Sequence, residues 1–283
     1  MQSKPKLLFS LLFLLMTASG LAAQQVPDTE FRPPIEKPAY PAGKGPIVLI
    51  DEAHKNFHTA AGRYLPFAEL LRRDGYVVKP SAVQFTAKTL RDAKVLVIAN
   101  AVEVFTTQEI AAVRAWVKGG GALLLIADHP PFAPPAAELG KVFGINFLSG
   151  VAVEPNNRSG RIVFRRADRT LMDHPVTKGI EEVATFTGTS FQLDKSGQPL
   201  LVFGSDVYSW KEENDPNPVL VKGHLQGAVL EFGKGRIAVF GEAAMFSAQL
   251  SGPDKRPMGM NAPIAKQNSQ FLLNVMHWLT RVM

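Results

Sequence analysis

The side chains best suited to catalysis or metal binding come directly after apolar runs of the chain. Four such runs end in polar residues that can carry a proton or bind a cation: Asp51, Glu52, His54 and His58 after 47–50, Asn100 after 95–99, Asp128 and His129 after 122–127, and Glu242 after 236–240. In open α/β sheets, ligands bind at the edge where the carboxyl ends of the strands meet. If these runs are neighbouring parallel strands, imidazoles and carboxylates converge there in a polar pocket.

Such a pocket fits a divalent metal site. Imidazole and carboxylate groups together suit Zn²⁺, whereas carboxylate and amide oxygens suit Mg²⁺, Mn²⁺ or Ca²⁺. The candidate metal ligands are Asp51, His54 and His129. The sequence around them lacks the two helical His four residues apart that mark zinc peptidases, so no motif specifies the metal.

The same pocket also fits metal-free acid–base chemistry, in which one carboxyl group is ionised and another is held neutral by its surroundings. The candidate catalytic residues are Glu52, Asp128, His129 and Glu242. Each position also has a structural interpretation. Asp51 and Glu52 can cap the helix that follows them, and Asp128 can stabilise a turn. The imidazole of His129 can hydrogen-bond to the backbone.

Hydrophobic periodicity predicts the elements that position these residues. Continuous apolar runs predict buried strands, and apolar residues three or four apart predict amphipathic helices. Up to residue 130 the two alternate, with strands expected at 47–50, 76–78, 95–99 and 122–127 and helices at 60–73, 86–93 and 106–118. This alternation is typical of a doubly wound α/β fold, with a mainly parallel sheet covered by helices on both faces.

The second half of the chain is less regular. It adds strand-like runs at 200–203, 219–221, 228–232 and 236–240 and a helix at 266–281. Gly233-Lys234-Gly235 predicts a hairpin between the last two strands. We therefore expect late antiparallel strands and a C-terminal helix to elaborate the parallel sheet. Residues 46–283 are expected to form a single domain.

The first residues are typical of an export signal. Lys4 and Lys6 precede an apolar run over 7–16, and small residues follow it. This order predicts a secretory signal peptide over residues 1–22. The Pro-rich segment 23–45 is then a leader that lies on the domain surface or stays mobile. The protein is expected to be periplasmic or secreted, without a stable membrane span after the signal is cleaved.

Charge and cysteine content exclude several classes of function. The 283 residues include 31 Lys and Arg against 25 Asp and Glu. Without Lys4 and Lys6 of the signal, 29 cationic residues remain and the net charge is +4, which is too small to favour a nucleic-acid partner. The chain contains no Cys. Disulfide bonds, a Cys nucleophile and Cys metal ligands are therefore excluded.

A family resemblance is carried by six segments: 48–54, 62–64, 70–76, 119–129, 241–246 and 268–279. Together they resemble the class I glutamine amidotransferase-like superfamily, and in particular a secreted branch of unknown function. The resemblance implies a flavodoxin-like three-layer sandwich. In amidotransferases the turn after the fourth strand holds a Cys nucleophile, whereas here it holds Asp128 and His129. Because this nucleophile is missing, glutamine hydrolysis by the family mechanism is excluded.

The sequence leaves two functions open. The first is a hydrolase, metal-assisted or acid–base, that acts on a carbohydrate or another component of the cell envelope. The second is a non-catalytic ligand-binding or envelope-assembly module that has the fold without the chemistry. The expected ligand is a small molecule or a glycan, and a divalent metal is the cofactor that the residue types suggest.

Overall fold

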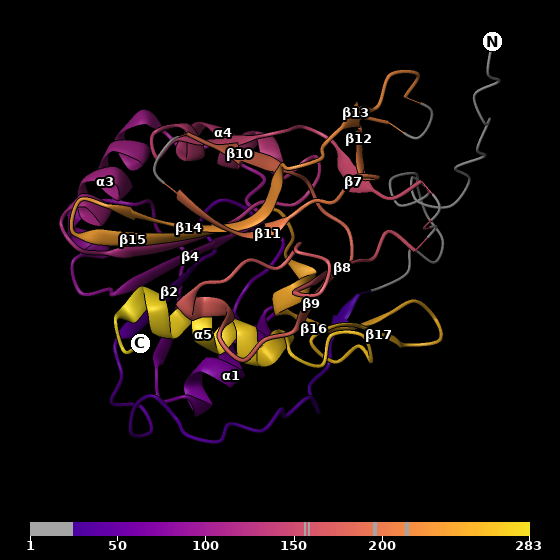
Figure 1. Ribbon diagram of the computed structural model, residues 1–283. Helices are drawn as coiled ribbons and strands as arrows, with labels where there is room; N and C mark the ends of the chain where they lie inside the picture. Colours follow the sequence, from indigo (N-terminus) through magenta and orange to yellow (C-terminus); the bar gives the residue numbers. More distant parts are fainter. Residues whose placement is uncertain (1–24, 156, 158, 195–196, 213–214) are drawn as a thin grey trace, which may run out of the picture.

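The computed structural model describes residues 25–155, 157, 159–194, 197–212 and 215–283. Its centre is a nine-stranded mixed sheet of β2 (Ile47–Asp51), β3 (Val77–Ser81), β4 (Val95–Ala99), β5 (Ala122–Ile126), β6 (Ile145–Phe147), β10 (Phe191–Leu193), β11 (Gly197–Val202), β14 (Leu225–Phe232) and β15 (Gly235–Phe240). The strands lie in the order β3-β2-β4-β5-β15-β14-β10-β6, and β11 also pairs with β14 (Figure 1).

Five strands form the parallel half of the sheet. β3, β2, β4, β5 and β15 each run parallel to their neighbours within this group. Every residue of β4 and β5 is buried. Both strands are continuous apolar runs because the sheet is covered on both faces, so neither side-chain direction meets water.

Helices cover the two faces of the sheet. They are α1 (Leu65–Arg73), α2 (Ala87–Leu90), α3 (Thr107–Lys118), α4 (Ala133–Lys141) and α5 (Asn268–Thr280). Side chains of α1 and α5 share one core with Val97 and Leu124 of the sheet. Those of α3 and α4 pack against Ile98 and Leu125, which point to the opposite face. In Figure 1, α3 and α4 lie above the sheet, and α1 and α5 lie below it.

The hairpin of β14 and β15 joins the parallel half to an antiparallel half. Phe232 pairs with Gly235 across a two-residue turn, as the glycine pattern predicts, and Gly233 takes the left-handed φ of 60° that such a turn requires. β10 and β11 run antiparallel to β14, and β6 runs antiparallel to β10. The sheet is therefore mixed rather than mainly parallel, because the strands beyond β15 alternate in direction.

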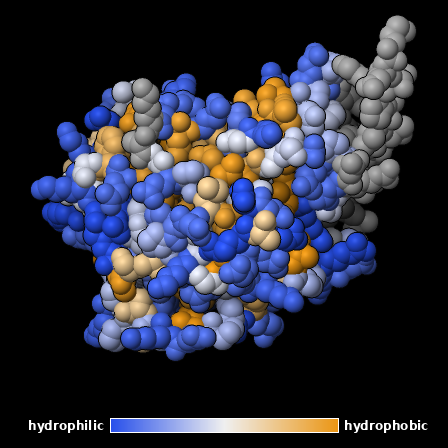
Figure 2. All heavy atoms as spheres, in the orientation of Figure 1, coloured by the Kyte–Doolittle hydropathy of each residue, from blue (hydrophilic) through white to orange (hydrophobic). Residues whose placement is uncertain are grey.

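Three smaller sheets flank the central one. They consist of β1 (Val26–Pro27), β16 (Ala248–Ser251) and β17 (Arg256–Gly259); of β7 (Val151–Val153), β12 (Tyr208–Trp210) and β13 (Val219–Leu220); and of β8 (Ile162–Arg165) and β9 (Glu182–Thr185). Two 3₁₀ helices are η1 (Pro175–Thr177) and η2 (Ala244–Phe246). Most of these strands are too short to show a period in the sequence. The hydrophobic area at the upper right of Figure 2 lies over β13, whose two residues are both exposed.

Residues 25–45 lie along the surface of the domain. β1 pairs with β16, and the backbone N–H of Ala39 donates to Asp74 Oδ1 at 2.8 Å. The ring of Tyr40 packs edge-on against that of Tyr76, with 5.2 Å between the centroids. These contacts connect the Pro-rich segment to the end of α1 and to the residues that lead into β3.

The α/β class and the C-terminal helix are confirmed, while some boundaries differ from the expected ones. The first long helix begins later than expected, at Leu65, because Tyr64 N–H bonds to the carbonyl of Thr59 at 3.1 Å and holds a turn there. The predicted signal peptide, 1–22, lies outside the described residues. In the part of the chain that the structure describes, no helix has the length and apolar character needed to cross a membrane.

Candidate functional site

The register between β5 and β15 brings the expected strand-end residues together. Phe240 of β15 pairs with Ile126 of β5 in parallel, so Asp128 and Glu242, each two residues further on, leave the sheet side by side. Asn100 follows the neighbouring β4 with a left-handed φ of 52°, which Asn tolerates better than most residues. Its Oδ1 accepts a hydrogen bond from the N–H of Asp128 at 2.9 Å.

Asp128 and Glu242 form a buried carboxyl pair, 6% and 0% exposed. Glu242 Oε1 accepts the N–H of Ala244 at 2.6 Å, and Oε2 accepts that of Met245 at 2.8 Å. Burial, followed by the negative charge of Asp128, raises the pKa of Glu242 well above its usual range, although these backbone N–H groups oppose the shift. The pair therefore favours a protonated Glu242, whose oxygens also cap the turn that follows β15.

His54 lies between two carboxylates. Its Nδ1 is 2.9 Å from Asp51 Oδ2, and its Nε2 is 3.0 Å from Glu109 Oε1. All three side chains are buried. Burial by itself would lower the pKa of His54, but the hydrogen bonds and charges of Asp51 and Glu109 together raise it. The three residues thus form an ion triad that connects the loop after β2 to the first turn of α3.

This triad does not fit the metal site expected from Asp51, His54 and His129. Both ring nitrogens of His54 already face carboxylate oxygens, so neither offers a lone pair to a metal ion. Among the residues that the structure describes, no group of three or more His, Asp or Glu is placed to hold a metal ion. Asp51 and His54 are adjacent as expected, but their third partner is Glu109 rather than a shared cation.

Glu52 and His129 take different positions at this edge of the sheet. Glu52 Oε1 accepts the N–H of Ala60 at 2.8 Å and so stabilises the loop between β2 and α1. It does not cap α1, which begins only at Leu65 and has no side-chain cap. His129 Nδ1 lies 2.9 Å from the carbonyl oxygen of Pro130. Its Nε2 lies 3.7 Å from Asp128 Oδ1, and its side chain is 34% exposed. His129 therefore contacts both the carboxyl pair and solvent.

Two further residues at this edge, His58 and Tyr64, were not among the predicted catalytic or metal-binding residues, although His58 was noted after the first strand. His58 is buried, with Nδ1 3.4 Å from Asn100 Nδ2. Burial and the nearby charge of Arg63 lower the pKa of His58 to about 3. The Tyr64 hydroxyl donates to the carbonyl of Ala243 at 3.0 Å. Burial and the Asp128–Glu242 carboxyl pair raise the pKa of Tyr64 well above its usual value. In the sequence, the position of His58 shortly after the first strand indicated that it lies at this edge of the sheet.

Glu109 is a third site residue outside the predicted set. Its sequence pattern predicts helix capping and not a contact with His54. Thr106 and Glu109 have the spacing of a capping box, and both of its hydrogen bonds form at the start of α3. The same carboxylate also accepts the N–H of Phe85 at 3.1 Å. A capping motif predicts the helix start, but not that the capping carboxylate also binds His54, which lies 55 residues away in the chain.

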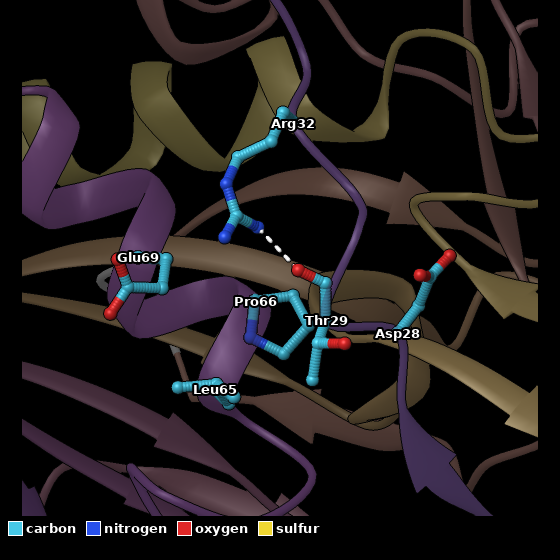
Figure 3. Close-up of a pocket in the computed structure, with 6 residues that line it drawn as sticks. All are labelled: Asp28, Thr29, Arg32, Leu65, Pro66 and Glu69. Carbon is cyan, nitrogen blue, oxygen red and sulfur yellow. Dashed lines mark hydrogen bonds between the residues drawn. The ribbon is translucent and has the colours of Figure 1, made fainter.

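Two hollows on the described surface are lined by other residues. The hollow in Figure 3 is lined by Asp28, Thr29, Arg32, Leu65, Pro66 and Glu69. In it, Arg32 Nη1 donates to the carbonyl oxygen of Thr29 at 2.9 Å. The second is lined by Arg166, Asp173, His174, Pro175, Lys178, Gly179 and Glu181. The candidate site is therefore defined by the strand ends and not by either hollow.

Much of the chain matches a known domain family. The model of a domain of unknown function, DUF4350, matches residues 57–249, which include the strand-end residues from Asn100 to Glu242. The chain belongs to the DUF4350 family. No curated protein sequence matches it. The family description assigns no activity to these residues.

Solved structures support the fold of this DUF4350 domain. The mmIFT52 N-terminal domain is 17% identical with a TM-score of 0.64, covering 82% of this chain and 97% of that one. The cytoplasmic protein STM1381 from Salmonella typhimurium LT2 is 14% identical with a TM-score of 0.54, covering 83% and 99%. A putative ThuA-like protein from Bacteroides uniformis ATCC 8492 is 16% identical with a TM-score of 0.53, covering 88% and 94%. At these identities the similarity concerns the fold alone.

Proposed function

We propose that this DUF4350 domain is an exported, non-catalytic binding domain for a small molecule or glycan, which contacts the rim of the strand-end site. One observation carries the proposal: the carboxyl groups of the site already bond to the protein itself. A catalytic acid or base needs a proton or lone pair within reach of the substrate. The carboxylates here are engaged and shielded instead.

The engaged groups include three of the four predicted catalytic residues, namely Glu52, Asp128 and Glu242. Both oxygens of Glu242 accept backbone N–H groups, and the side chain is fully buried. Glu52 holds the N–H of Ala60. Asp51 and Glu109 occupy both nitrogens of His54. These bonds stabilise the loops after the strands, which supports a scaffold role for the residues beneath the rim.

The rim consists of Phe57, Arg63, His129 and Phe132. Phe57 is 43% exposed, although most large apolar side chains of the domain are buried. The guanidinium carbon of Arg63 lies 3.5 Å from the Phe57 ring centroid. Phe132 lies 5.2 Å from Phe57 and 6.3 Å from His129, measured between ring centroids. Aromatic rings beside a few polar groups are the usual lining of sites for small organic ligands.

The proposal also covers the fold type and the superfamily of the domain. We infer a flavodoxin-like three-layer arrangement and descent from the glutamine amidotransferase-like superfamily without its Cys. The parallel strands from β3 to β15 support this inference. So do the two separate cores, one shared with α1 and α5 and the other with α3 and α4.

Export is the part of the proposal that rests on the sequence of the first residues. The mature protein, isolated from the periplasm or the culture fluid of its host, is expected to begin at residue 23 or 24. N-terminal sequencing of the isolated chain tests this. Recovery of the chain from the cytoplasm with Met1 to Ala22 still attached would contradict export.

Binding and turnover are measured on the same preparation. A glycan and small-molecule panel is screened with the parent protein, Phe57→Ala, His129→Ala and the control Val219→Ala. Val219 is 43% exposed, like Phe57, but lies on β13. We expect a ligand that the parent and the control retain, that both rim variants bind more weakly, and that is recovered unchanged after incubation.

Two results would overturn the binding proposal. One is chemical conversion of the retained ligand by the parent protein. The other is equal binding by the parent and by both rim variants, which would place the ligand elsewhere. Circular dichroism and thermal unfolding of each variant establish that any loss of binding does not come from loss of the fold.

A second candidate is an acid–base hydrolase, favoured by the carboxyl pair. Burial and the charge of Asp128 raise the pKa of Glu242, so one carboxyl group holds a proton beside another. His129 Nε2, 3.7 Å from Asp128, would exchange the proton with the substrate. Hydrolysis of a panel ligand that disappears in Asp128→Asn and Glu242→Gln, with the fold retained, would select this candidate.

A further inference from the structure

Two buried N–H groups beside the rim have no acceptor. Within the described residues, His58 Nε2 and Arg63 Nε are both shielded from solvent and make no hydrogen bond. His58 as a whole is only 4% exposed. Buried polar groups are paired in the great majority of cases, because leaving one unpaired is unfavourable. Two unpaired N–H groups on one loop, at His58 and Arg63, therefore point to an interaction with a ligand.

The hydrogen-bond network fixes His58 Nε2 as a donor. Asn100 Oδ1 accepts the N–H of Asp128 at 2.9 Å, so the amide nitrogen of Asn100 must be the group that faces His58 Nδ1 at 3.4 Å. An amide nitrogen only donates, so Nδ1 accepts. Burial and the charge of Arg63 keep the pKa of His58 at about 3, and the ring is neutral at physiological pH. A neutral ring that accepts at Nδ1 carries its proton on Nε2.

The position of Arg63 leaves its Nε–H free as well. The guanidinium carbon lies 3.5 Å from the Phe57 ring centroid, a distance at which only a face-to-face orientation avoids overlap with the ring. The N–H groups lie in the guanidinium plane and so point past the ring. Nη1 reaches the carbonyl oxygen of Phe57 at 3.4 Å, whereas Nε has no partner. Burial lowers the pKa of Arg63, but a guanidinium remains cationic.

The two donors belong to one compact loop. Within this loop, the N–H of Gly62 and that of Tyr64 both bond to the carbonyl of Thr59 at 3.1 Å, which closes the turn. Arg63 is close enough for its charge to act on the His58 ring. The Phe57 ring contacts both, at 5.8 Å from the His58 ring centroid and 3.5 Å from the Arg63 guanidinium.

Nearby carboxylates do not satisfy these donors. The oxygens of Asp128 accept the N–H of His129 at 2.8 Å and that of Ala243 at 3.4 Å. Glu52 accepts the N–H of Ala60. Two N–H groups on one loop, one of them on a cation, are the kind of donor that a carboxylate accepts. A neutral donor and a guanidinium together favour an anion over an uncharged acceptor.

We propose that His58 and Arg63 bind the carboxylate of an acidic small molecule, such as a uronic acid, through His58 Nε2–H and Arg63 Nε–H. The exposed Phe57 ring forms the apolar wall beside this carboxylate. The inference rests on the proposed binding function and specifies the ligand class for the same rim. It also gives the orientation of the ligand, with its acid group toward the β2–α1 loop and its ring toward Phe57.

The test is calorimetric titration of the full-length mature protein at constant ionic strength. The probes are galacturonate, its neutral counterpart galactose, acetate and sulfate. The proteins are the parent, Arg63→Lys, His58→Phe and the control Arg73→Lys, which changes an exposed arginine at the end of α1. Arg63→Lys keeps the charge but removes the Nε donor, so it stays informative if His58→Phe does not fold.

We expect galacturonate to bind the parent and the control equally and more tightly than galactose. Each site variant should weaken it by roughly tenfold, the effect of losing one charge-assisted hydrogen bond. A crystal structure of the parent with galacturonate should show the carboxylate between the two N–H groups.

Three results would overturn the inference. The first is binding of galacturonate to the parent and to both site variants with the same affinity. The second is that none of galacturonate, acetate and sulfate binds. The third is a crystal structure that shows only water between the two donors at saturating galacturonate. Phe57-dependent binding of a neutral glycan in any of these cases would leave the proposed binding function standing, whereas conversion of the probe would overturn that function separately.

Discussion

Two histidines on one loop show how strongly the surroundings of a residue decide its chemistry. His54 lies between Asp51 and Glu109, whose hydrogen bonds and charges outweigh burial and raise its pKa. His58, four residues later, is buried beside Arg63, and both effects lower its pKa to about 3. The sequence presents the same side chain twice, yet one stabilises an ion triad and the other is a neutral hydrogen-bond donor.

His58 is expected to destabilise the fold in acid. The unfolded chain binds a proton on this side chain near pH 6.5, whereas the folded protein resists protonation until about pH 3. The free energy of unfolding should therefore fall by about 1.4 kcal/mol per pH unit as the pH drops below 6.5. Urea unfolding of the parent and His58→Phe at several pH values should show a shallower decline for the variant.

The titration of His54 does not contribute to this loss of stability below pH 6.5. Because its pKa is raised in the folded protein, its stabilising effect is complete below pH 6.5 and is lost only as the pH rises through the raised value. His174 and His224 also have lowered pKa values, but they are present in both proteins and cancel in the difference. Parallel stability curves for the parent and His58→Phe would contradict a buried neutral His58.

At the scale of elements, the first turn of α3 is an anchor for two loops. Glu109 accepts from the N–H and the hydroxyl of Thr106 through Oε2, at 3.0 and 2.8 Å. Through Oε1 it bonds to His54 and to the N–H of Phe85. A single carboxylate thus connects α3 to the loop after β2 and to the loop before α2.

Replacing this carboxylate should loosen all three segments. Glu109→Gln removes the negative charge that faces His54. It also places an amide NH₂, which cannot accept a hydrogen bond, among groups that donate to the carboxylate. We expect a loss of about 2 kcal/mol in the free energy of unfolding at neutral pH, typical of hydrogen bonds to charged groups. Glu138→Gln is the matched control, because its side chain on α4 is 61% exposed and should change stability little. Equal effects of the two substitutions in denaturant titrations would contradict the anchor.

At the scale of the whole molecule, Asp74 joins the Pro-rich segment to the end of α1 and to the C-terminal helix α5. Its Oδ1 accepts the N–H of Ala39, and its Oδ2 lies 2.7 Å from His277 Nε2 on α5. Asp74 itself follows α1 and is fully buried. Residues 25–45 therefore belong to the folded domain, because their contacts reach the C-terminal helix through one carboxylate.

A shortened chain tests this contribution. A protein that starts at residue 46 loses the β1–β16 pairing, the Ala39 hydrogen bond and the Tyr40–Tyr76 ring contact. Compared with a protein that starts at residue 24, we expect a loss of about 2 kcal/mol or more, a drop in Tm of roughly 4–8 °C. Differential scanning calorimetry of both proteins makes the comparison. Identical melting temperatures would mean that the segment only rests on the surface.

The sequence by itself determined the local features of this protein. The apolar runs 95–99 and 122–127 predict β4 and β5, Thr106 predicts the start of α3, and Gly233-Lys234-Gly235 predicts the turn between β14 and β15. These features depend on neighbouring residues, so their patterns are visible in the chain. The absence of Cys, another sequence property, excludes the amidotransferase nucleophile.

Only the tertiary structure decided which polar groups meet and whether they remain free. The pairing of β15 with β5 places Glu242 beside Asp128, and the Ala243 N–H that bonds to Asp128 lies 115 residues away in the chain. His54 has a carboxylate on each side because α3 packs against the β2 loop. Residue types at strand ends indicate where chemistry could occur. Their hydrogen-bond partners come from distant segments, so the sequence pattern could not show that most of them are already occupied.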